Sequence, residues 1–200
     1  MVDEKRIIKH LFEKQKPLLK HTEQPHKKII LAFSGIPCTG KTHIAKLIEE
    51  KYKGVRINSD DLRKIIRKLG KKKKILLDEV YKEEILKKYL YGLIENYPFK
   101  NKLVILDSGI DRKYEEVNSR AKKHGFELLV IRVEGNKSIA EKGIVKKLGK
   151  PDKNFVNNID RWVKEYEEFG KTKKYDFLVK NDQETGLETE DLFNKLDKLL

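Results

Sequence analysis

The sequence is poor in cysteine and has no long apolar run, and both absences narrow the classes of protein to which it can belong. Cys38 is the only cysteine, so no internal disulfide can form and a reducing cytoplasm is expected. No apolar stretch approaches the roughly 20 residues that a membrane helix needs. No signal-peptide pattern opens the sequence, and the five histidines show no metal-ligand spacing. We therefore expect a cytoplasmic protein that does not insert into membranes.

The charge balance is strongly basic, with a formal net charge of +14. A basic surface favours an anionic partner such as nucleic acid. However, only eight of the 46 basic residues are arginines, and the lysines occur in every region of the chain. Arginine is the usual choice for bidentate phosphate contacts, whereas lysine enrichment also marks some thermophile proteomes. Both interpretations stay open, and the even spread of charge slightly favours the compositional one.

A glycine-rich stretch, AFSGIPCTGKTH at residues 32–43, fits the pattern G-x-x-x-x-G-K-[ST] at every fixed position. The pattern predicts a loop whose backbone N–H groups surround phosphates at the start of a helix. Lys41 would reach the β- and γ-phosphates of ATP, and the Thr42 hydroxyl would bind Mg²⁺. The flanking segments are those that the motif requires, an apolar strand before it and an amphipathic helix after it. The predicted nucleotide-binding residues are Gly35, Ile36, Pro37, Cys38, Thr39, Gly40, Lys41 and Thr42.

Apolar runs and helical repeats alternate along the chain. Strands are predicted over residues 28–33, 54–58, 102–109, 126–133 and 175–181. Amphipathic helices are predicted between them, one of which opens with Ser138 and Glu141 at capping-box spacing. The alternation predicts an α/β, three-layer P-loop NTPase fold, with a five-stranded parallel sheet, helices on both faces and a helical lid. Residues 1–27 are expected to form an N-terminal helical extension, and residues 28–200 the domain.

Polar residues follow the predicted strands, at the sheet edge where ligands bind in such folds. Asp60 and Arg63 come after the second strand and share a helix face. A carboxylate there can accept a hydroxyl proton, while the guanidinium holds an anionic acceptor. The ordinary alternative is an exposed Asp–Arg pair in a first helical turn. Asp107 ends the run LVILD within the third predicted strand, and this run resembles a Walker B strand and predicts an Mg²⁺ or substrate contact.

Two further matches to nucleotide-binding patterns are interpreted as accidental. ILLDE, at residues 75–79, resembles an ATPase Walker B strand, but its apolar residues continue a helical period through residue 94. NKLD, at residues 194–197, matches a guanine-reading pattern but lies within the predicted final helix rather than in a loop. Ser108 follows Asp107 where an ATPase would place a glutamate. The sequence therefore lacks an evident water-activating residue.

A basic segment at about residues 138–155 is a candidate lid. Its lysines could move positive charge over the transferring phosphate, and the predicted lid residues are Lys146, Lys147 and Lys150. The alternative is a solvated basic helix end, because lysines near a helix C-terminus also complement its dipole.

Four segments together, GIPCTGKT, INSDDLRKII, VILDSGIDR and YDFLVKND, resemble small P-loop kinases of the branch that contains polynucleotide 5′-hydroxyl kinases and zeta-toxin-like kinases. The resemblance implies that Lys41 and Thr42 contact ATP and Mg²⁺, that Asp60 is the general base and that Arg63 contacts the acceptor. It also implies that Asp107 lies near the acceptor or metal and that Asn181 borders the adenine. The family usually has arginines in its lid, whereas this segment has only lysines.

The predicted function is an ATP-dependent kinase that moves the γ-phosphate to a hydroxyl group, with a polynucleotide 5′-hydroxyl of RNA or DNA as the first choice of acceptor. A zeta-toxin-like or small-metabolite kinase is the nearest alternative. A nucleotide-driven ATPase or switch, and a nucleic-acid-binding module without turnover, also remain open. Acceptor-independent ATP hydrolysis would favour the switch, and salt-sensitive nucleic-acid binding unaffected by ATP would favour the module.

Overall fold

A computed structural model describes residues 9, 13, 27–72, 79–96, 103–150, 153–173, 175–182 and 186–200. The predicted N-terminal extension lies outside these residues except for Lys9, Glu13 and residue 27, and Lys9 and Glu13 are both helical.

The centre of the domain is the parallel sheet predicted from the sequence. Its strands are β1 (Ile29–Ser34), β2 (Val55–Asn58), β3 (Leu103–Gly109), β4 (Glu127–Val133) and β5 (Phe177–Val179). They are ordered β2-β3-β1-β4-β5, and every neighbouring pair is parallel. All carboxyl ends therefore lie at one edge, and the α/β fold class is confirmed.

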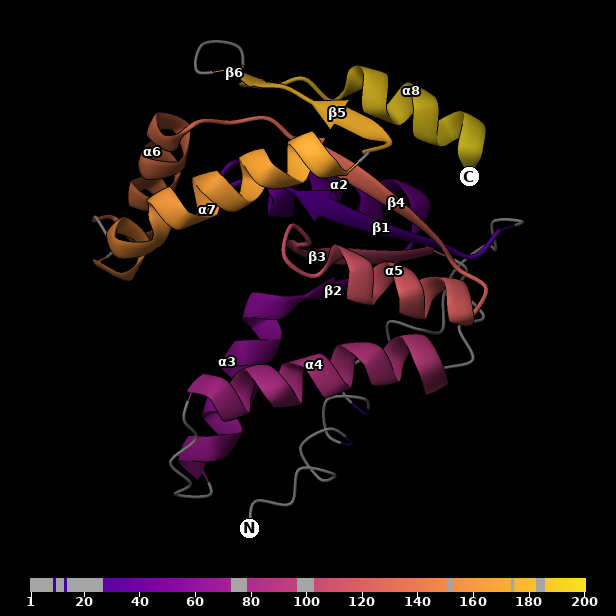
Figure 1. Cartoon of the computed structure of the whole chain (residues 1–200), viewed down its shortest axis with the longest axis horizontal. Coiled ribbons are helices and arrows are strands. Elements are labelled where there is room, and N and C mark those ends of the chain that lie inside the picture. The colour runs from indigo at the N-terminus through magenta and orange to yellow at the C-terminus, as the bar shows by residue number, and fades with distance from the viewer. Residues whose placement is uncertain are drawn as a thin grey trace.

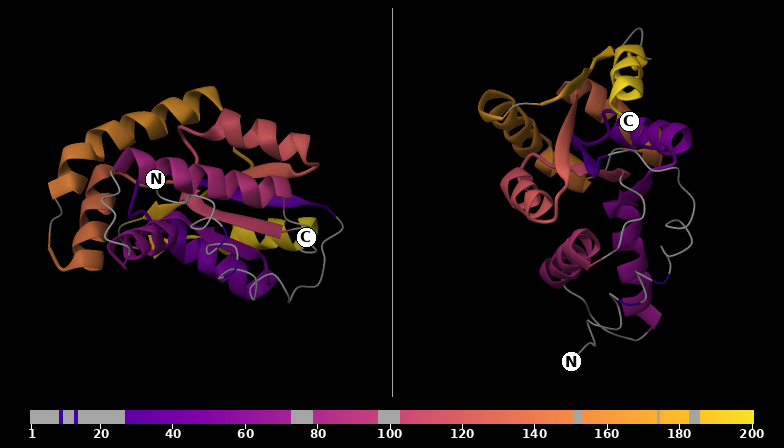
Figure 2. Two further views of the ribbon diagram at one scale, coloured as in Figure 1. Left: turned by 90° about the horizontal axis from the view of Figure 1, so that it is seen from below. Right: turned by 90° about the vertical axis from the view of Figure 1, so that its right-hand side faces the viewer.

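Helices cover both faces of this sheet (Figure 1). They are α2 (Lys41–Tyr52), α3 (Ser59–Lys72), α4 (Glu79–Asn96), α5 (Tyr114–Lys123), α6 (Lys137–Leu148), α7 (Lys153–Thr172) and α8 (Glu190–Leu199). In Figure 2, α2 and α8 lie on one side of the sheet, with α5 and α7 on the other. The order of layers is thus helix, sheet, helix, as predicted.

Side chains of the central strand alternate between two apolar cores, as strand geometry requires. Ile30 and Ala32 pack with residues of α3, α4 and α5, while Leu31 and Phe33 pack with residues of α2 and α8. All four side chains are fully buried. A continuous apolar run in a parallel strand is explained by this covering of both faces.

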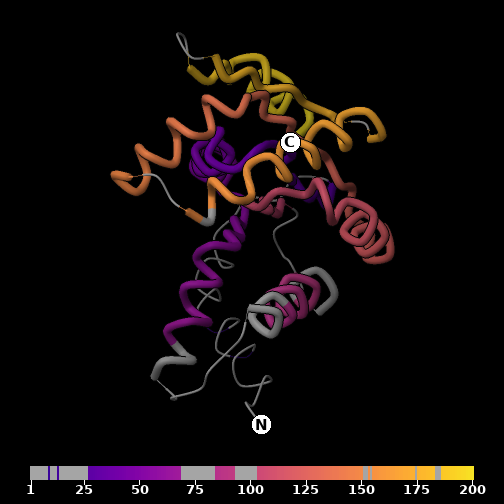
Figure 3. The backbone as a smooth tube through the Cα atoms, turned by 60° about the vertical axis from the view of Figure 1, so that its left-hand side comes forward, coloured from indigo at the N-terminus to yellow at the C-terminus, as the bar shows by residue number. Residues whose placement is uncertain are grey.

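A third apolar cluster lies beyond the carboxyl edge of the sheet and joins α6 to α7. Its buried members are Ile36, Ala140, Ile144, Phe155, Ile159 and Tyr166. In Figure 3, α6 and α7 follow each other on one side of the molecule, while α3 runs away from the sheet beside α4. Because Ile36 belongs to the glycine-rich loop, this cluster attaches the two helices directly to that loop.

Two local predictions are wrong. The side chain that caps α6 is Asn136, whose Oδ1 accepts from the Ile139 N–H at 3.0 Å, rather than Ser138, which lies inside the helix. The strand predicted over 175–181 ends at Val179, and Asn181 belongs to a separate antiparallel hairpin of β6 (Asn181–Asp182) and β7 (Gly186–Leu187). Two-residue strands are too short to produce a period that a sequence can reveal.

The structure describes one of the two motif matches that we set aside in full, NKLD, which lies within α8 (Glu190–Leu199). Glu79 begins α4, whereas residues 75–78 lie outside the described part of the chain. Asp197 of the NKLD match lies in α8, where its carboxylate accepts a 2.8 Å hydrogen bond from the Tyr52 hydroxyl. Asp197 therefore attaches α8 to α2.

Candidate active site

The glycine-rich loop connects β1 to α2 at the carboxyl edge of the sheet, as the motif predicts. Gly40 caps α2 with φ of +104°, and a Cβ atom at that position would lie 2.7 Å from a Leu187 methyl carbon. The positive φ favours glycine there, and a larger residue would also have to displace the Leu187 side chain. Cys38 also has a positive φ, +68°, which is unusual outside glycine and occurs preferentially at functional sites. The loop has the curled backbone expected of a phosphate-binding loop.

The ammonium group of Lys41 is held inside this loop. Its Nζ donates to the carbonyl oxygens of Gly35, at 2.7 Å, and Ile36, at 2.6 Å. Burial lowers the pKa of Lys41 to about 8, although the carboxylates of Asp111 and Asp107 act in the opposite direction. Lys41 is thus a half-buried cation at the helix N-terminus where the phosphates of a nucleotide are expected.

Asp107 of β3 lies directly beside Thr42 of α2. The Thr42 hydroxyl donates to Asp107 Oδ1 at 3.0 Å. Asp107 pairs with Asn58 in the β2–β3 register, and the Asn58 amide also donates to Asp107 Oδ2. Asp107 is buried. A hydroxyl and a carboxylate oxygen therefore meet where the glycine-rich loop ends.

Asp60 lies at the start of α3 and forms contacts with two cations. Arg63 Nη1 lies 3.0 Å from Asp60 Oδ1, and Lys147 Nζ of α6 lies 3.6 Å from Oδ2. The Asp60 side chain is 59% exposed, so these are surface ion pairs that contribute little to stability. The structure thus brings Asp60, Arg63 and one predicted lid lysine together. The other two, Lys146 and Lys150, are exposed.

The helix α6 approaches the glycine-rich loop very closely at Gly143. A Cβ atom at Gly143 would lie 2.3 Å from the Cys38 carbonyl oxygen, closer than any real contact. A second contact between the same elements is apolar, since Ile36 is buried against Ala140 and Ile144. The predicted lid segment is therefore packed against the loop in this structure.

Asn181 also contacts the glycine-rich loop, from the β6–β7 hairpin. Its Nδ2 donates to the Thr39 carbonyl oxygen at 2.8 Å. Leu187 of the same hairpin packs against Gly40. That Asn181 borders the adenine stays a prediction. Its hydrogen bond to Thr39 attaches the β6–β7 hairpin to the glycine-rich loop.

Two residues of the site were not predicted from the sequence. Asp111, in the quoted segment VILDSGIDR, accepts from the Ser34 hydroxyl at 2.6 Å, and burial raises its pKa. A register shift between β1 and β3, which pairs Phe33 with Gly109, brings it there. Arg56 of β2 contacts Asp107, with Nη1 2.8 Å from Oδ2. Both Asp111 and Arg56 are charged residues in or beside a strand near the predicted ligand edge, and this is the sequence feature that could have indicated them.

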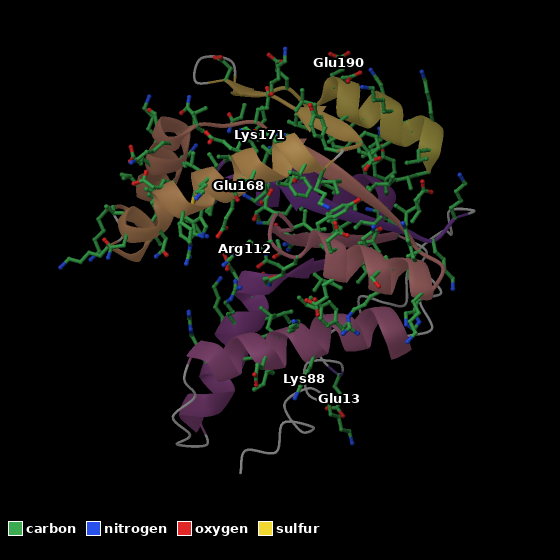
Figure 4. The ribbon with its side chains drawn as sticks, viewed as in Figure 1. Glu13, Lys88, Arg112, Glu168, Lys171 and Glu190 are labelled. Carbon is green, nitrogen blue, oxygen red and sulfur yellow. The ribbon has the colours of Figure 1, made fainter. Side chains whose placement is uncertain are left out.

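Arg112 follows Asp111 and joins this edge to α7. Its Nε lies 3.1 Å from a Glu165 carboxylate oxygen, and its side chain occupies the space between α7 and the start of α3 (Figure 4).

Among the described residues, no three His, Cys, Asp or Glu side chains gather as a metal-binding group. None of the described helices combines the length and apolar character that a membrane span requires.

The fold and the site together define the class of the protein. A parallel sheet of order β2-β3-β1-β4-β5, with a glycine-rich loop that leads into α2, is that of a P-loop nucleotide-binding protein of the small-kinase type. The chain belongs to the AAA domain family, whose sequence model matches residues 30–168. The match contains the loop, Asp60 and Asp107. No curated protein sequence matches the chain.

Solved structures with the same fold include kinases of distant sequence. A structure from the PezAT chromosomal toxin–antitoxin system of Streptococcus pneumoniae has a TM-score of 0.61 at 15% identity, covering 100% of this chain and 88% of that one. A gluconokinase from Sinorhizobium meliloti has a TM-score of 0.52 at 15% identity, covering 78% and 84%. A protein from Chloroflexus aurantiacus has a TM-score of 0.55 at 11% identity, covering 88% and 100%. At these identities the likeness concerns the fold.

Proposed function

We propose that this protein is an ATP-dependent kinase that transfers the γ-phosphate of ATP to a hydroxyl group of a small molecule. The observation that carries the proposal is the position of Asp60, an exposed carboxylate whose ion pair with Lys147 bridges α3 and the helix packed on the glycine-rich loop. An acceptor bound beside Asp60 would thus face the end of the nucleotide.

Thr42 and Asp107 are suited to hold Mg²⁺. The metal prefers oxygen ligands, is commonly bound through one or two protein groups, and takes its remaining ligands from phosphates and water. A hydroxyl oxygen and a nearly buried carboxylate oxygen, 3.0 Å apart, provide that set. When bound, Mg²⁺ supplies charge neutralisation at the β- and γ-phosphate oxygens.

The proposed reaction uses the residues of the chain for positioning and proton transfer. The acceptor oxygen forms a bond to the γ-phosphorus while the bond from that phosphorus to the bridging oxygen breaks, and ADP leaves. Asp60 takes the hydroxyl proton. Lys41 exchanges its contacts with the Gly35 and Ile36 carbonyls for the phosphates, and Lys147 neutralises charge on the transferring group. Arg63 holds an anionic part of the acceptor.

A small hydroxylated metabolite is the acceptor that we favour over a polynucleotide 5′-hydroxyl. The sequence alone favoured the polynucleotide, but the matched structures include a gluconokinase and a toxin–antitoxin protein. Those likenesses, together with the zeta-toxin-like segments of the sequence, favour a sugar, sugar acid or nucleotide sugar.

The experiment is a transfer assay with ATP that carries a radioactive γ-phosphate. Acceptors are sugars, sugar acids, nucleosides, nucleotide sugars and oligonucleotides with a 5′-hydroxyl, each tested with wild-type protein and with Lys41→Ala. We expect label on one class of small molecule, and no label with Lys41→Ala. Label on oligonucleotides alone would show that the polynucleotide prediction was correct. Release of inorganic phosphate without any labelled acceptor would contradict kinase activity altogether.

A further inference from the structure

We propose that Arg56 is a positioning residue that holds the Asp107 carboxylate toward Thr42 and prevents a divalent cation from binding there before the nucleotide. The inference rests on the proposed function, because it assumes that Thr42 and Asp107 receive the metal of Mg·ATP. It gives Arg56 a role in making the nucleotide bind before the metal. Neither the glycine-rich loop nor the Walker B resemblance implies such a role.

The position of Arg56 follows from the alternation of β2. Val55 and Ile57 point into the core formed with α3 and α4, so Arg56 and Asn58 must point toward the opposite face, where α2 lies. On that face the guanidinium lies between two carboxylates. Nη1 is 2.8 Å from Asp107 Oδ2, and Nε is 2.7 Å from Glu49 Oε2 of α2.

The two carboxylate oxygens of Asp107 accept hydrogen bonds from two different elements, β2 and α2. Oδ2 accepts from Arg56 and Asn58, while Oδ1 accepts from Thr42 at 3.0 Å. The guanidinium therefore fixes the rotation of the carboxylate so that Oδ1 faces α2. Because side-chain exposure is 2% for Asp107 and 16% for Arg56, water screens this pair only weakly.

The charge of the cluster explains the proposed effect on metal binding. Glu49, Arg56 and Asp107 together carry one net negative charge, and Lys41 lies close enough to act electrostatically on Asp107. The affinity of oxygen-ligand sites for divalent cations depends on the number of uncompensated carboxylates. With Arg56 present, the site has enough uncompensated negative charge to bind a cation only when the phosphates of ATP are also bound. Without Arg56, two carboxylates would attract a cation on their own.

A purely structural role for Arg56 makes a different prediction. If the residue only ties β2 to α2, its removal should lower thermal stability and leave metal affinity in the absence of nucleotide unchanged. Metal binding without nucleotide therefore separates the two roles, and it does not depend on catalytic activity.

The test measures Mn²⁺ binding to the full chain by electron paramagnetic resonance of free Mn²⁺, with and without a non-hydrolysable ATP analogue. For wild-type protein we expect Mn²⁺ alone to bind at least about tenfold more weakly than Mn²⁺ with the analogue. For Arg56→Gln we expect Mn²⁺ alone to bind at least about tenfold more tightly than to wild type, which reduces the advantage given by the nucleotide by the same factor.

Three control variants accompany it. Arg56→Lys keeps the charge and should bind Mn²⁺ alone as weakly as wild type. Glu49→Gln keeps the Arg56–Asp107 pair and should also give no gain. Adding Asp107→Asn to Arg56→Gln should abolish the gain, because it removes the carboxylate that Arg56 masks.

The outcomes separate this inference from the proposed function. If wild type binds the Mn²⁺–nucleotide complex but Arg56→Gln gains no affinity for Mn²⁺ alone, the role of Arg56 is wrong and the kinase proposal stands. If wild type binds Mn²⁺ alone as tightly as with the analogue, the inference is overturned without any variant, even where Arg56→Gln does not fold. If wild type binds no Mn²⁺ even with the analogue, the metal site of the proposed function fails, and this inference with it.

Discussion

The ammonium group of Lys147 lies 3.6 Å from a carboxylate oxygen of Asp60, so that a salt bridge joins the basic helix α6 to the acidic start of α3. Both side chains are more than half exposed, at 61% and 59%, and such a pair contributes at most about 1 kcal/mol to folding. The contact therefore matters for where it places charge. It puts a cation and a carboxylate at the edge where the glycine-rich loop presents Lys41.

Asp60 and Asp61 form a matched pair of variants. Both lie in the first turn of α3, are similarly exposed and form an ion pair with a basic residue three positions later, Arg63 and Lys64 respectively. A general base contributes about 10²–10⁴-fold to a rate, so Asp60→Asn should lower turnover by that factor with little change in Mg·ATP affinity. Asp61→Asn should leave turnover within about twofold of wild type, since the loss of a surface ion pair changes only stability. Equal effects of the two changes on turnover would show that Asp60 is only a helix-start residue.

Lys147 is predicted to be the lysine of the lid that acts on the transferring phosphate. Lys147→Met should lower the transfer rate by at least about tenfold, because a donor aimed at developing charge stabilises the transition state. Lys146→Met, at the preceding residue of α6, which is also exposed, serves as the control and should stay near wild type. Thermal melting should move little in either variant. A larger loss of rate with Lys146→Met would assign the lid function to that residue.

Gly143 is predicted to be required for contact between α6 and the glycine-rich loop. Alanine within a helix normally stabilises it by about 1 kcal/mol relative to glycine. At Gly143 the added Cβ would lie 2.3 Å from the Cys38 carbonyl oxygen, so Gly143→Ala must push the helix and the loop apart. Overpacking of this kind costs about 1–3 kcal/mol, which corresponds to a fall in Tm of about 2–12 °C in a chain of this size. Glu141→Ala, on the same helix, is the control. A Tm for Gly143→Ala at or above that of wild type would show that α6 does not depend on this contact.

The pH dependence of ATP binding should follow Lys41. Its pKa in the folded protein is about 8, lowered by burial from an unfolded value of 10.5, so the ammonium loses its charge as the pH rises above about 8. ATP binding needs the charged form and should weaken above pH 8, by up to about tenfold per pH unit. The same shift means that the unfavourable burial of the charge is relieved between pH 8 and 10.5, so the contribution of Lys41 to the free energy of unfolding rises over that range. Calorimetric titration at pH 7, 8 and 9 checks the first effect. Lys41→Met should bind weakly with no slope above pH 8, and a slope as steep as that of wild type would assign the titration to another group.

The fold could be predicted from the sequence because its strands are continuous apolar runs. Residues such as Leu31 and Phe33 are buried on one face while Ile30 and Ala32 are buried on the other, and only a sheet covered on both sides explains such a run. Asp60, Asp107 and Lys41 were found for a related reason. They lie at the ends of strands or in the loop itself, and in parallel sheets those ends gather at one edge.

The remaining features depend on register and on side-chain packing, which a sequence does not display. Asp111 reaches Ser34 only because β3 shifts its register against β1 near Gly109. In the sequence, nothing distinguishes Arg56 from the other basic residues. Only the pairing of β2 with β3 shows that it lies beside Asp107. The cap of α6 was assigned to Ser138 from spacing, whereas the extended backbone at Asn136 lets that side chain reach the first turn instead.

The fate of the γ-phosphate tests the central claim most directly. Phosphorus nuclear magnetic resonance can follow a reaction of ATP, Mg²⁺, the wild-type protein and the best small-molecule acceptor from the labelling assay. We predict that ADP and one new phosphate monoester appear in equal amounts, with little inorganic phosphate, and that both form at least about 100-fold more slowly with Asp60→Asn. ADP and inorganic phosphate that form in equal amounts, at the same rate with and without acceptor, would contradict it.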